Sequence, residues 1–107
     1  MTRRLVLAPD QVRSVRADPR FEAAWVASQV GADPGWRAAG RCLSVDPGTF
    51  FPDPPELAER AVRVCHGCPV AGPCLATALA TAEPEGIWGG TTPHERRAMR
   101  VVWTGRC

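Results

Sequence analysis

Apolar residues along this chain recur at helical spacing, and no stretch of alternating β-branched residues predicts a strand. Phe21 and Trp25 are four residues apart, so they fall on the same face of a helix. Asp18-Pro19 can begin this helix, with Asp as the N-cap and Pro in the first turn, and Gly31 can end it. Before it we expect only a frayed or loosely helical segment over residues 1–17.

Further helices are predicted between proline- and glycine-rich breaks. Asp53-Pro54-Pro55-Glu56 is a variant of a capping box, and Thr92-Pro93-His94-Glu95 is a complete one, with Thr as N-cap and Glu three residues later. Gly72-Pro73 is expected to separate two of the helices. The predicted helices run from about Leu57 to Cys65, from Cys74 to about Thr81, and from Pro93 to about Trp103.

The connections are predicted to be irregular, with a short helical turn over 36–42, a loop over 43–52 and a tight turn over the glycine-rich residues 86–90. The fold class expected is therefore all-α, a small irregular bundle of about four to five short helices. We expect three parts: residues 1–34, an N-terminal extension helical over about 18–30; residues 35–104, the main domain; and residues 105–107, a tail.

Composition leaves room for only a thin core. The chain has 107 residues, of which 11 are Pro and 10 are Gly. A domain of this size is helped by an additional constraint such as a metal centre. The net charge of +2 is too small to indicate nucleic-acid binding by itself. The N-terminal apolar run is too short for a signal peptide, and no segment suits a membrane span. We therefore expect a cytoplasmic protein without a membrane partner.

The strongest chemical signal comes from cysteine. The count of five is odd, so a closed disulfide framework fits poorly, and in a reducing compartment close cysteines indicate metal or redox chemistry. Cys42, Cys65, Cys68 and Cys74 are spaced C-x22-C-x2-C-x5-C. Thiolates favour zinc, copper(I) or iron–sulfur clusters. Three ligands from one stretch and a fourth from afar are typical of an iron–sulfur site, whereas zinc sites more often use two short chelating pairs. The spacing favours iron–sulfur and leaves zinc open.

Other candidates near these cysteines have weaker signals. Cys65 and Cys68 also resemble a redox dithiol, but the βαβ pattern that surrounds such pairs in thioredoxin-like proteins is not predicted here. His66 would crowd Cys65 as a ligand, so we expect it to be exposed or to support the site indirectly. His94 is interpreted as a residue at a helix start, and Cys107 as a free thiol.

Taken together, these segments resemble the WhiB-like regulators of actinobacteria over residues 36–100. The segments that carry the resemblance are Trp36-Arg37, Cys42, Asp46-Pro47, Phe50-Phe51-Pro52, Cys65-x2-Cys68-Pro69-Val70-x3-Cys74-Leu75, Gly86-Ile87-Trp88-Gly89-Gly90 and Glu95-Arg96-Arg97. The resemblance implies a helical bundle around one 4Fe-4S cluster held by Cys42, Cys65, Cys68 and Cys74. It also implies a regulator, not an enzyme, that responds to oxygen or nitric oxide and whose cysteines can form disulfides without the cluster.

The same resemblance implies binding to the C-terminal domain of the principal sigma factor, as a monomer within a heterocomplex at promoter DNA. Partner contacts are expected from Trp88, Gly89 and Gly90 of the glycine turn and from Phe50 and Phe51. Trp88 suits either a core anchor or a binding hot spot. Adjacent rings cannot both point the same way, so one phenylalanine is expected beside the cluster and the other toward the partner.

A basic group near the C-terminus is the candidate for DNA contact. Arg96, Arg97 and Arg100 recur at near-helical spacing, and they suit either an ordinary solvated face or phosphate binding. The chain ends Gly105-Arg106-Cys107 and lacks the full AT-hook of some members, so DNA is expected to be reached within the sigma-factor complex.

Two expectations concern the cluster's surroundings. Backbone N–H groups of Gly67 and of residues 86–90 can bond to the sulfurs, and the site should be shallow enough to admit small gases. A structural zinc module and a thiol–disulfide reductase using Cys65 and Cys68 remain the alternatives.

Overall fold

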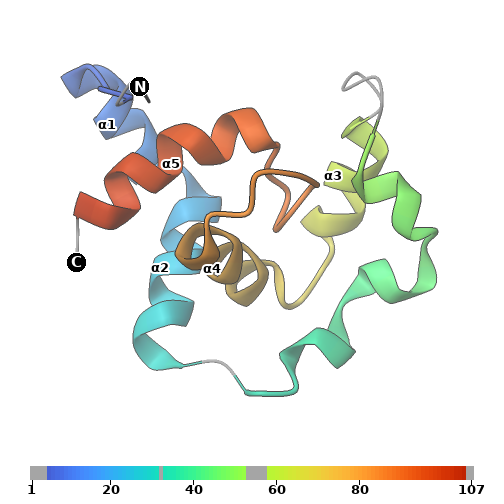
Figure 1. The fold of residues 1–107 in the computed structure, drawn as a ribbon. Helices are drawn as coiled ribbons and strands as arrows, with labels where there is room; N and C mark the ends of the chain where they lie inside the picture. Colours follow the sequence, from blue (N-terminus) through green and yellow to red (C-terminus); the bar gives the residue numbers. More distant parts are fainter. Residues whose placement is uncertain (1–4, 32, 53–57, 106–107) are drawn as a thin grey trace.

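A computed structural model describes residues 5–31, 33–52 and 58–105 (Figure 1). Within these ranges the chain is helical, and its one β-type pairing is an isolated bridge between Trp88 and Thr91. The all-α prediction is therefore confirmed. The α-helices are α1 (Pro9–Ala17), α2 (Pro19–Val30), α3 (Ala58–His66), α4 (Ala71–Thr81) and α5 (Pro93–Gly105), and the 3₁₀ turns are η1 (Trp36–Ala39), η2 (Arg41–Ser44) and η3 (Pro47–Phe50).

The N-terminal segment is more ordered than its sequence suggested. Residues 9–17, expected to be frayed or loosely helical, form α1, whose start is stabilised by a hydrogen bond of 2.7 Å from the Ala8 N–H to Gln11 Oε1. Val15 of α1 is buried in the core. Tertiary packing of Val15, with the partly buried Val12 of the same helix, completes a helix that local propensity alone leaves marginal.

Helix α2 begins and ends where predicted. Asp18 is its N-cap and accepts a hydrogen bond of 2.9 Å from the Arg20 N–H, and Gly31 ends it with a φ of +84°. Phe21 is fully buried, and Trp25 is half-buried on the same face. The Trp103 ring of α5 meets both edge-on, with centroid distances of 5.9 Å to Phe21 and 5.4 Å to Trp25.

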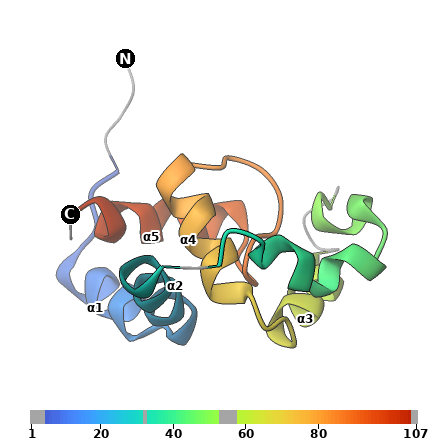
Figure 2. The same cartoon turned by 90° about the horizontal axis from the view of Figure 1, so that it is seen from below.

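The main core lies where α2 packs against α4 (Figure 1 and Figure 2), with α5 contributing from the other end of the chain. Its buried members are Val15, Phe21, Ala24, Leu75, Leu79, Met99, Val102 and Trp103. Residues of the segment expected to be an N-terminal extension therefore supply part of the same core as α4 and α5. The fold uses this segment to cover one side of the domain.

Helix α4 begins earlier than predicted. We expected Gly72-Pro73 to interrupt the helical structure and Cys74 to begin the helix. Instead, Gly72 and Pro73 lie inside the first turn of α4. N–H groups in a first helical turn have no intrahelical partner, so Pro73 costs nothing there. Gly72 has a packing role, because its backbone lies close to Ala23 of α2.

Helix α3 follows the prediction closely, from Ala58 to His66, whereas the expected capping sequence at residues 53–56 lies outside the described residues. An arm of three 3₁₀ turns, η1 to η3, precedes it where we expected one short turn and a loop. The arm is the green segment in Figure 1, and its η2 and η3 pack on α3. A second buried cluster joins the two parts through Phe50, Ala58, Ala61, Cys65 and Ile87.

The capping box before α5 forms as predicted. Thr92 Oγ1 accepts a hydrogen bond of 3.2 Å from the Glu95 N–H, and Glu95 Oε1 accepts one of 3.0 Å from the Thr92 N–H. In the part of the chain that the structure describes, no helix is both long and apolar enough to cross a membrane.

The contact of Gly72 with α2 leads to a test of the fold. A Cβ at position 72 would lie 3.0 Å from the Ala23 carbonyl oxygen, so Gly72→Ala must move α4 away from α2. Overpacking of this kind costs about 1–3 kcal/mol of unfolding free energy. Gly105→Ala is the matched control, because nothing lies within 4 Å of its added Cβ. Urea unfolding of the reduced proteins gives both values, and equal stability of the two variants would contradict the contact.

Candidate metal centre

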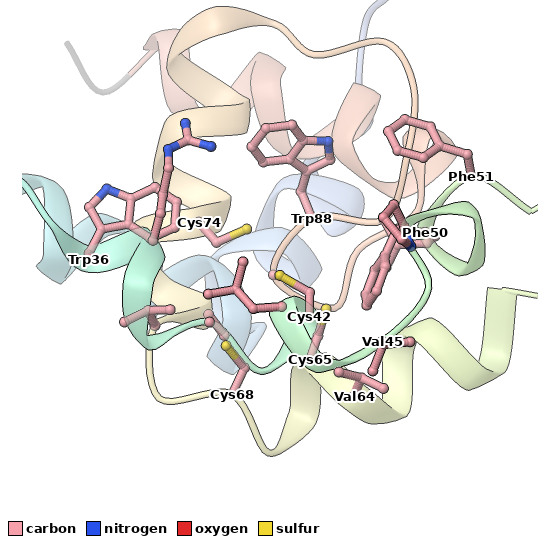
Figure 3. A pocket seen from close by; sticks show the side chains of 18 residues that line it. Trp36, Cys42, Val45, Phe50, Phe51, Val64, Cys65, Cys68, Cys74 and Trp88 are labelled. Carbon is pink, nitrogen blue, oxygen red and sulfur yellow. The ribbon is translucent and has the colours of Figure 1, made fainter.

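The four cysteines singled out by their spacing line one cavity of about 440 Å³ (Figure 3). Cys42 lies on η2, Cys65 on the last turn of α3, Cys68 on the α3–α4 connection and Cys74 in the first turns of α4. All four are free thiols. Folding therefore gathers around one space four soft donors that are up to 32 positions apart in sequence.

The connection between α3 and α4 places three of these donors. The Cys68 N–H donates to the Cys65 carbonyl at 3.0 Å, which closes a turn at the end of α3. The Cys74 N–H then donates to the Val70 carbonyl at 3.0 Å, inside α4. The connection thus carries Cys65, Cys68 and Cys74 past the same cavity.

The cavity wall between the cysteines is mostly apolar. Val45, Val64, Phe50 and Ile87 contribute to it, and Trp88 lies on the opposite side from Val64 (Figure 3). One of the four thiols, Cys42, is exposed to solvent. This exposure agrees with the expectation of a shallow site.

The thiols are spread around the cavity. Among the residues that the structure describes, no three Cys, His, Asp or Glu side chains are close enough together to hold one metal ion. His66, which we expected to be exposed or to support the site indirectly, is exposed and does not line the cavity. The donor set around the cavity is therefore four thiols without an imidazole.

Backbone N–H groups of the glycine turn reach two of the sulfurs. Burial raises the pKa of Cys65, and it raises that of Cys74 to about 11. Hydrogen bonds from Gly90 and Gly89 to Cys65, and from Gly89 to Cys74, oppose this rise because they stabilise a charged sulfur. The predicted donors within residues 86–90 are therefore present. Over Gly67, the other predicted donor, the structure instead packs the Arg41 guanidinium.

The glycine turn lies directly on α4. Gly89 has a φ of +56°, and a Cβ there would be 2.6 Å from the Ala71 carbonyl oxygen and 2.7 Å from Leu75 Cβ. Gly90 has a φ of +79°. Both glycines are buried, so they shape the turn from inside, and their predicted contact with a partner stays a prediction.

Phe50 and Phe51 point to different environments, as expected for adjacent rings. Phe50 is 8% exposed and packs against the α3 cluster, whereas Phe51 is 59% exposed and lies at the cavity, farther from the cysteines than Phe50 (Figure 3). Trp88 is half-buried, and its indole N–H donates to the Glu85 carbonyl at 3.1 Å. The Trp88 indole is thus held in place by a hydrogen bond, and part of its ring lines the cavity.

Arg37 borders the cavity, although no pattern in the sequence marked it as a site residue. Its guanidinium carbon lies 4.7 Å from the Trp36 ring centroid and 5.9 Å from that of Trp88, both within the range of a cation–π contact. It therefore bridges η1 and the glycine turn beside the cavity. The adjacent pair Trp36-Arg37 was a visible signal, but sequence alone does not show that Trp88 lies on the other side.

The expectation that Arg96 contacts DNA is wrong. Its side chain is 3% exposed and donates to three backbone carbonyls, those of Thr91 at 2.9 Å, Glu85 at 3.0 Å and Glu83 at 3.3 Å. Residues 83–91 form few backbone hydrogen bonds with one another, and within the loop only Trp88 donates to the Thr91 and Glu85 carbonyls, so Arg96 adds donors that connect the loop to α5. Arg96 serves the loop, and burial accordingly lowers its pKa.

The two other arginines of this group differ from Arg96 and from each other. Arg100 is half-buried and donates to the Leu79 carbonyl at the end of α4, so it is largely engaged within the fold. Arg97 is exposed, and its one described contact is a hydrogen bond of 3.4 Å with His94 Nδ1. Of the three, Arg97 alone has the free surface that a phosphate contact requires.

Comparison with known proteins assigns the chain that carries this cavity to a protein family. Residues 36–99 match the family described as Transcription factor WhiB. The chain belongs to the WhiB family. The matched stretch includes all four cysteines and the glycine turn, and it ends inside α5. Helices α1 and α2 lie before it.

WhiB-family relatives align over the same region. The chain is 43% identical over 70 residues to transcriptional regulator WhiB1 of Mycobacterium tuberculosis, covering 61% of this chain and 83% of that protein. It is 41% identical over 66 residues to transcriptional regulator WhiB of Streptomyces coelicolor, covering 62% and 76%. It is 42% identical over 65 residues to WhiB2 of Mycolicibacterium smegmatis, covering 61% of this chain but only half of that protein.

The glycine turn provides a test of the site. Gly89→Ala places a side chain against Ala71 and Leu75 at a left-handed φ, so the turn must leave α4. Strain and overpacking together should cost roughly 2–5 kcal/mol of unfolding free energy. Gly48→Ala is the control, since its added Cβ meets only Asp46 Oδ1, at 3.4 Å. If urea unfolding showed both variants to be equally stable, the turn would not depend on this contact.

Proposed function

We propose that this WhiB-family chain binds one 4Fe-4S cluster through Cys42, Cys65, Cys68 and Cys74 and acts as a transcriptional regulator. The observation that carries the proposal is the convergence of four free thiols on one largely apolar cavity. Clusters of this type are held by four cysteine thiolates and are tuned by hydrogen bonds to sulfur. The N–H groups of Gly89 and Gly90 suit that second requirement.

The spacing of the thiols supports a cluster over a single ion. Zinc needs four sulfurs about 2.3 Å from one point. Within the described residues, no three potential ligands are grouped closely enough for one ion. A cluster distributes its ligands over several iron atoms, so a wider ring of thiols fits it better.

The position of Cys42 suggests how the site acts on the fold. When bound, a 4Fe-4S cluster supplies a centre that oxygen or nitric oxide can attack. Cys42 is exposed and lies on the arm, whereas the other three ligands lie on α3, α4 and their connection. Ligation by all four would tie the arm to the helices, and loss of the cluster would release that tie because metal binding is coupled to folding.

The reductase alternative has less support. A catalytic dithiol needs a thiolate with a lowered pKa, and burial raises the pKa of Cys65. The described residues also lack the βαβ pattern that carries such pairs. These observations favour a regulator over an enzyme.

We further propose that the partner is the C-terminal domain of the principal sigma factor, bound by one copy of this chain. Leu43 and Phe51, at the cavity, are 68% and 59% exposed, and Trp88 is half-buried beside them. Aromatic side chains around a pocket, with exposed apolar surface beside them, suit a binding surface in which Trp88 is the candidate hot spot. Promoter DNA would be reached within this complex, with Arg97 as the remaining candidate for phosphate contact.

The cluster is tested by the visible spectrum of anaerobically purified protein, with iron, sulfide and zinc assayed on the same sample. We expect a brown protein with about four iron and four sulfide per chain. Cys→Ser at 42, 65, 68 or 74 should abolish the absorption, and Cys107→Ser, outside the described residues, should leave it unchanged. A colourless protein with one tightly held zinc would instead establish the structural zinc module.

The partner surface is tested with cluster-loaded protein and the isolated sigma-factor domain. Phe51→Ala should weaken binding by about tenfold or more, since a buried hot-spot ring contributes more than about 1.4 kcal/mol. Val30→Ala is the control, because Val30 is an 80% exposed apolar residue that does not line the cavity. Anaerobic calorimetry measures both affinities, and unchanged binding by Phe51→Ala would exclude this surface.

A further inference from the structure

A side chain from α2 holds the glycine turn through the Gly90 carbonyl. Arg20 donates to the Gly90 carbonyl at 2.8 Å and to Glu95 Oε2 at 2.7 Å. The same guanidinium pairs with Asp18 Oδ2 at 2.7 Å. Arg20 therefore connects the N-cap of α2, the glycine turn and the capping box of α5.

Gly90 is close to both this arginine and a cysteine. A Cβ built on Gly90 would be 3.6 Å from Cys65 Cβ and 3.8 Å from Arg20 Cδ. The Gly90 N–H bonds to the Cys65 sulfur, and the Gly90 carbonyl accepts from Arg20. Arg20 thus fixes the same residue that donates to the sulfur.

The rest of the turn is held by other contacts. Gly89 rests on α4, and Arg96 donates to the Thr91 carbonyl at 2.9 Å. The paired hydrogen bonds between Trp88 and Thr91, at 3.0 and 3.2 Å, close the turn. Of these supports for the turn, Arg20 is the one that comes from outside the residues matched to the WhiB family.

The arginine remains fully paired at neutral pH. Burial opposes ionisation of Asp18 and Glu95, but hydrogen bonds from Arg20 outweigh it, so the pKa of each carboxyl is lowered. Charge-assisted hydrogen bonds of this kind are shorter and stronger than neutral ones. A half-buried guanidinium with two carboxylates and one carbonyl has little freedom to move, which makes it a rigid support for Gly90.

We propose that Arg20 is a positioning residue for the metal centre: by holding the Gly90 carbonyl, it keeps the N–H groups of Gly89 and Gly90 directed at Cys65 and Cys74. This inference rests on the proposed cluster function and adds to it a determinant within α2. Hydrogen bonds to cluster sulfurs favour the more negative, reduced state, and so raise the reduction potential. Loosening the turn should therefore lower the potential and make the iron easier to lose.

The test compares Arg20→Ala, Arg20→Lys and the control Arg16→Ala, which removes an exposed arginine from the last turn of α1. Lysine keeps the charge beside Asp18, but as a point charge it cannot serve three acceptors in a fixed fork. Arg20→Lys is thus expected to retain more of the stability than Arg20→Ala while still releasing Gly90. Urea unfolding establishes that each variant is folded.

Two measurements then examine the turn and the centre separately. In metal-free full-length protein, hydrogen exchange at the Gly90 and Thr91 amides should be faster in both Arg20 variants than in wild type or Arg16→Ala. In cluster-loaded protein, both Arg20 variants should have a lower midpoint potential and lose iron about tenfold faster in air, the size of effect typical of lost support around a ligand.

The outcomes distinguish this inference from the proposed function. Folded Arg20 variants with wild-type exchange rates and wild-type potential would overturn the positioning role while leaving the cluster established. If the wild-type chain takes up no iron, the proposed function fails, and the exchange measurement alone decides whether Arg20 positions the turn. A slowed exchange or a raised potential in the Arg20 variants would also contradict the proposal.

Discussion

The close approach of the glycine turn to α4 is the constraint on which the candidate centre depends. Gly89 lies so near Ala71 and Leu75 that no side chain fits between them, and its φ of +56° is one that L-residues rarely adopt. This approach brings the Gly89 and Gly90 N–H groups to the sulfurs of Cys65 and Cys74. It also sets the position of Trp88, which borders the cavity from the same turn.

Three arginines of this chain serve the backbone, although most of the described arginines are exposed. Arg20, Arg96 and Arg100 all donate to main-chain carbonyls of the turn, of the segment before it, or of the end of α4. Loop carbonyl groups lack the regular backbone hydrogen bonds of a helix or a sheet. A carbonyl that is buried without a hydrogen-bond donor costs stability. A guanidinium has five donors in a fixed fork, so one side chain can satisfy several such groups. The domain thus compensates for its short helices and irregular arm.

The helical core and the candidate centre are connected through α4. One face of α4 packs on α2 through Gly72 and Leu79. The first turns of α4 also carry Cys74 and the residues that Gly89 contacts, Ala71 and Leu75. The N-terminal helices therefore support the centre although they precede the matched family region. This arrangement explains why α1 and α2 belong to the same folded unit as the candidate centre.

Much of this protein was determined by local sequence. Asp18-Pro19 and Thr92-Pro93-His94-Glu95 predicted two helix starts because capping depends on residues within one turn. The spacing of the four cysteines identified the candidate donors, and the adjacency of Phe50 and Phe51 required opposite orientations. Only the tertiary structure decided which arginines are free. Arg96 and Arg97 are neighbours with the same chemistry, but one faces loop 83–91 and the other faces solvent. Likewise, no local pattern relates Arg20 to Gly90, 70 residues away, because their contact exists only once α2, α4 and the turn have packed together.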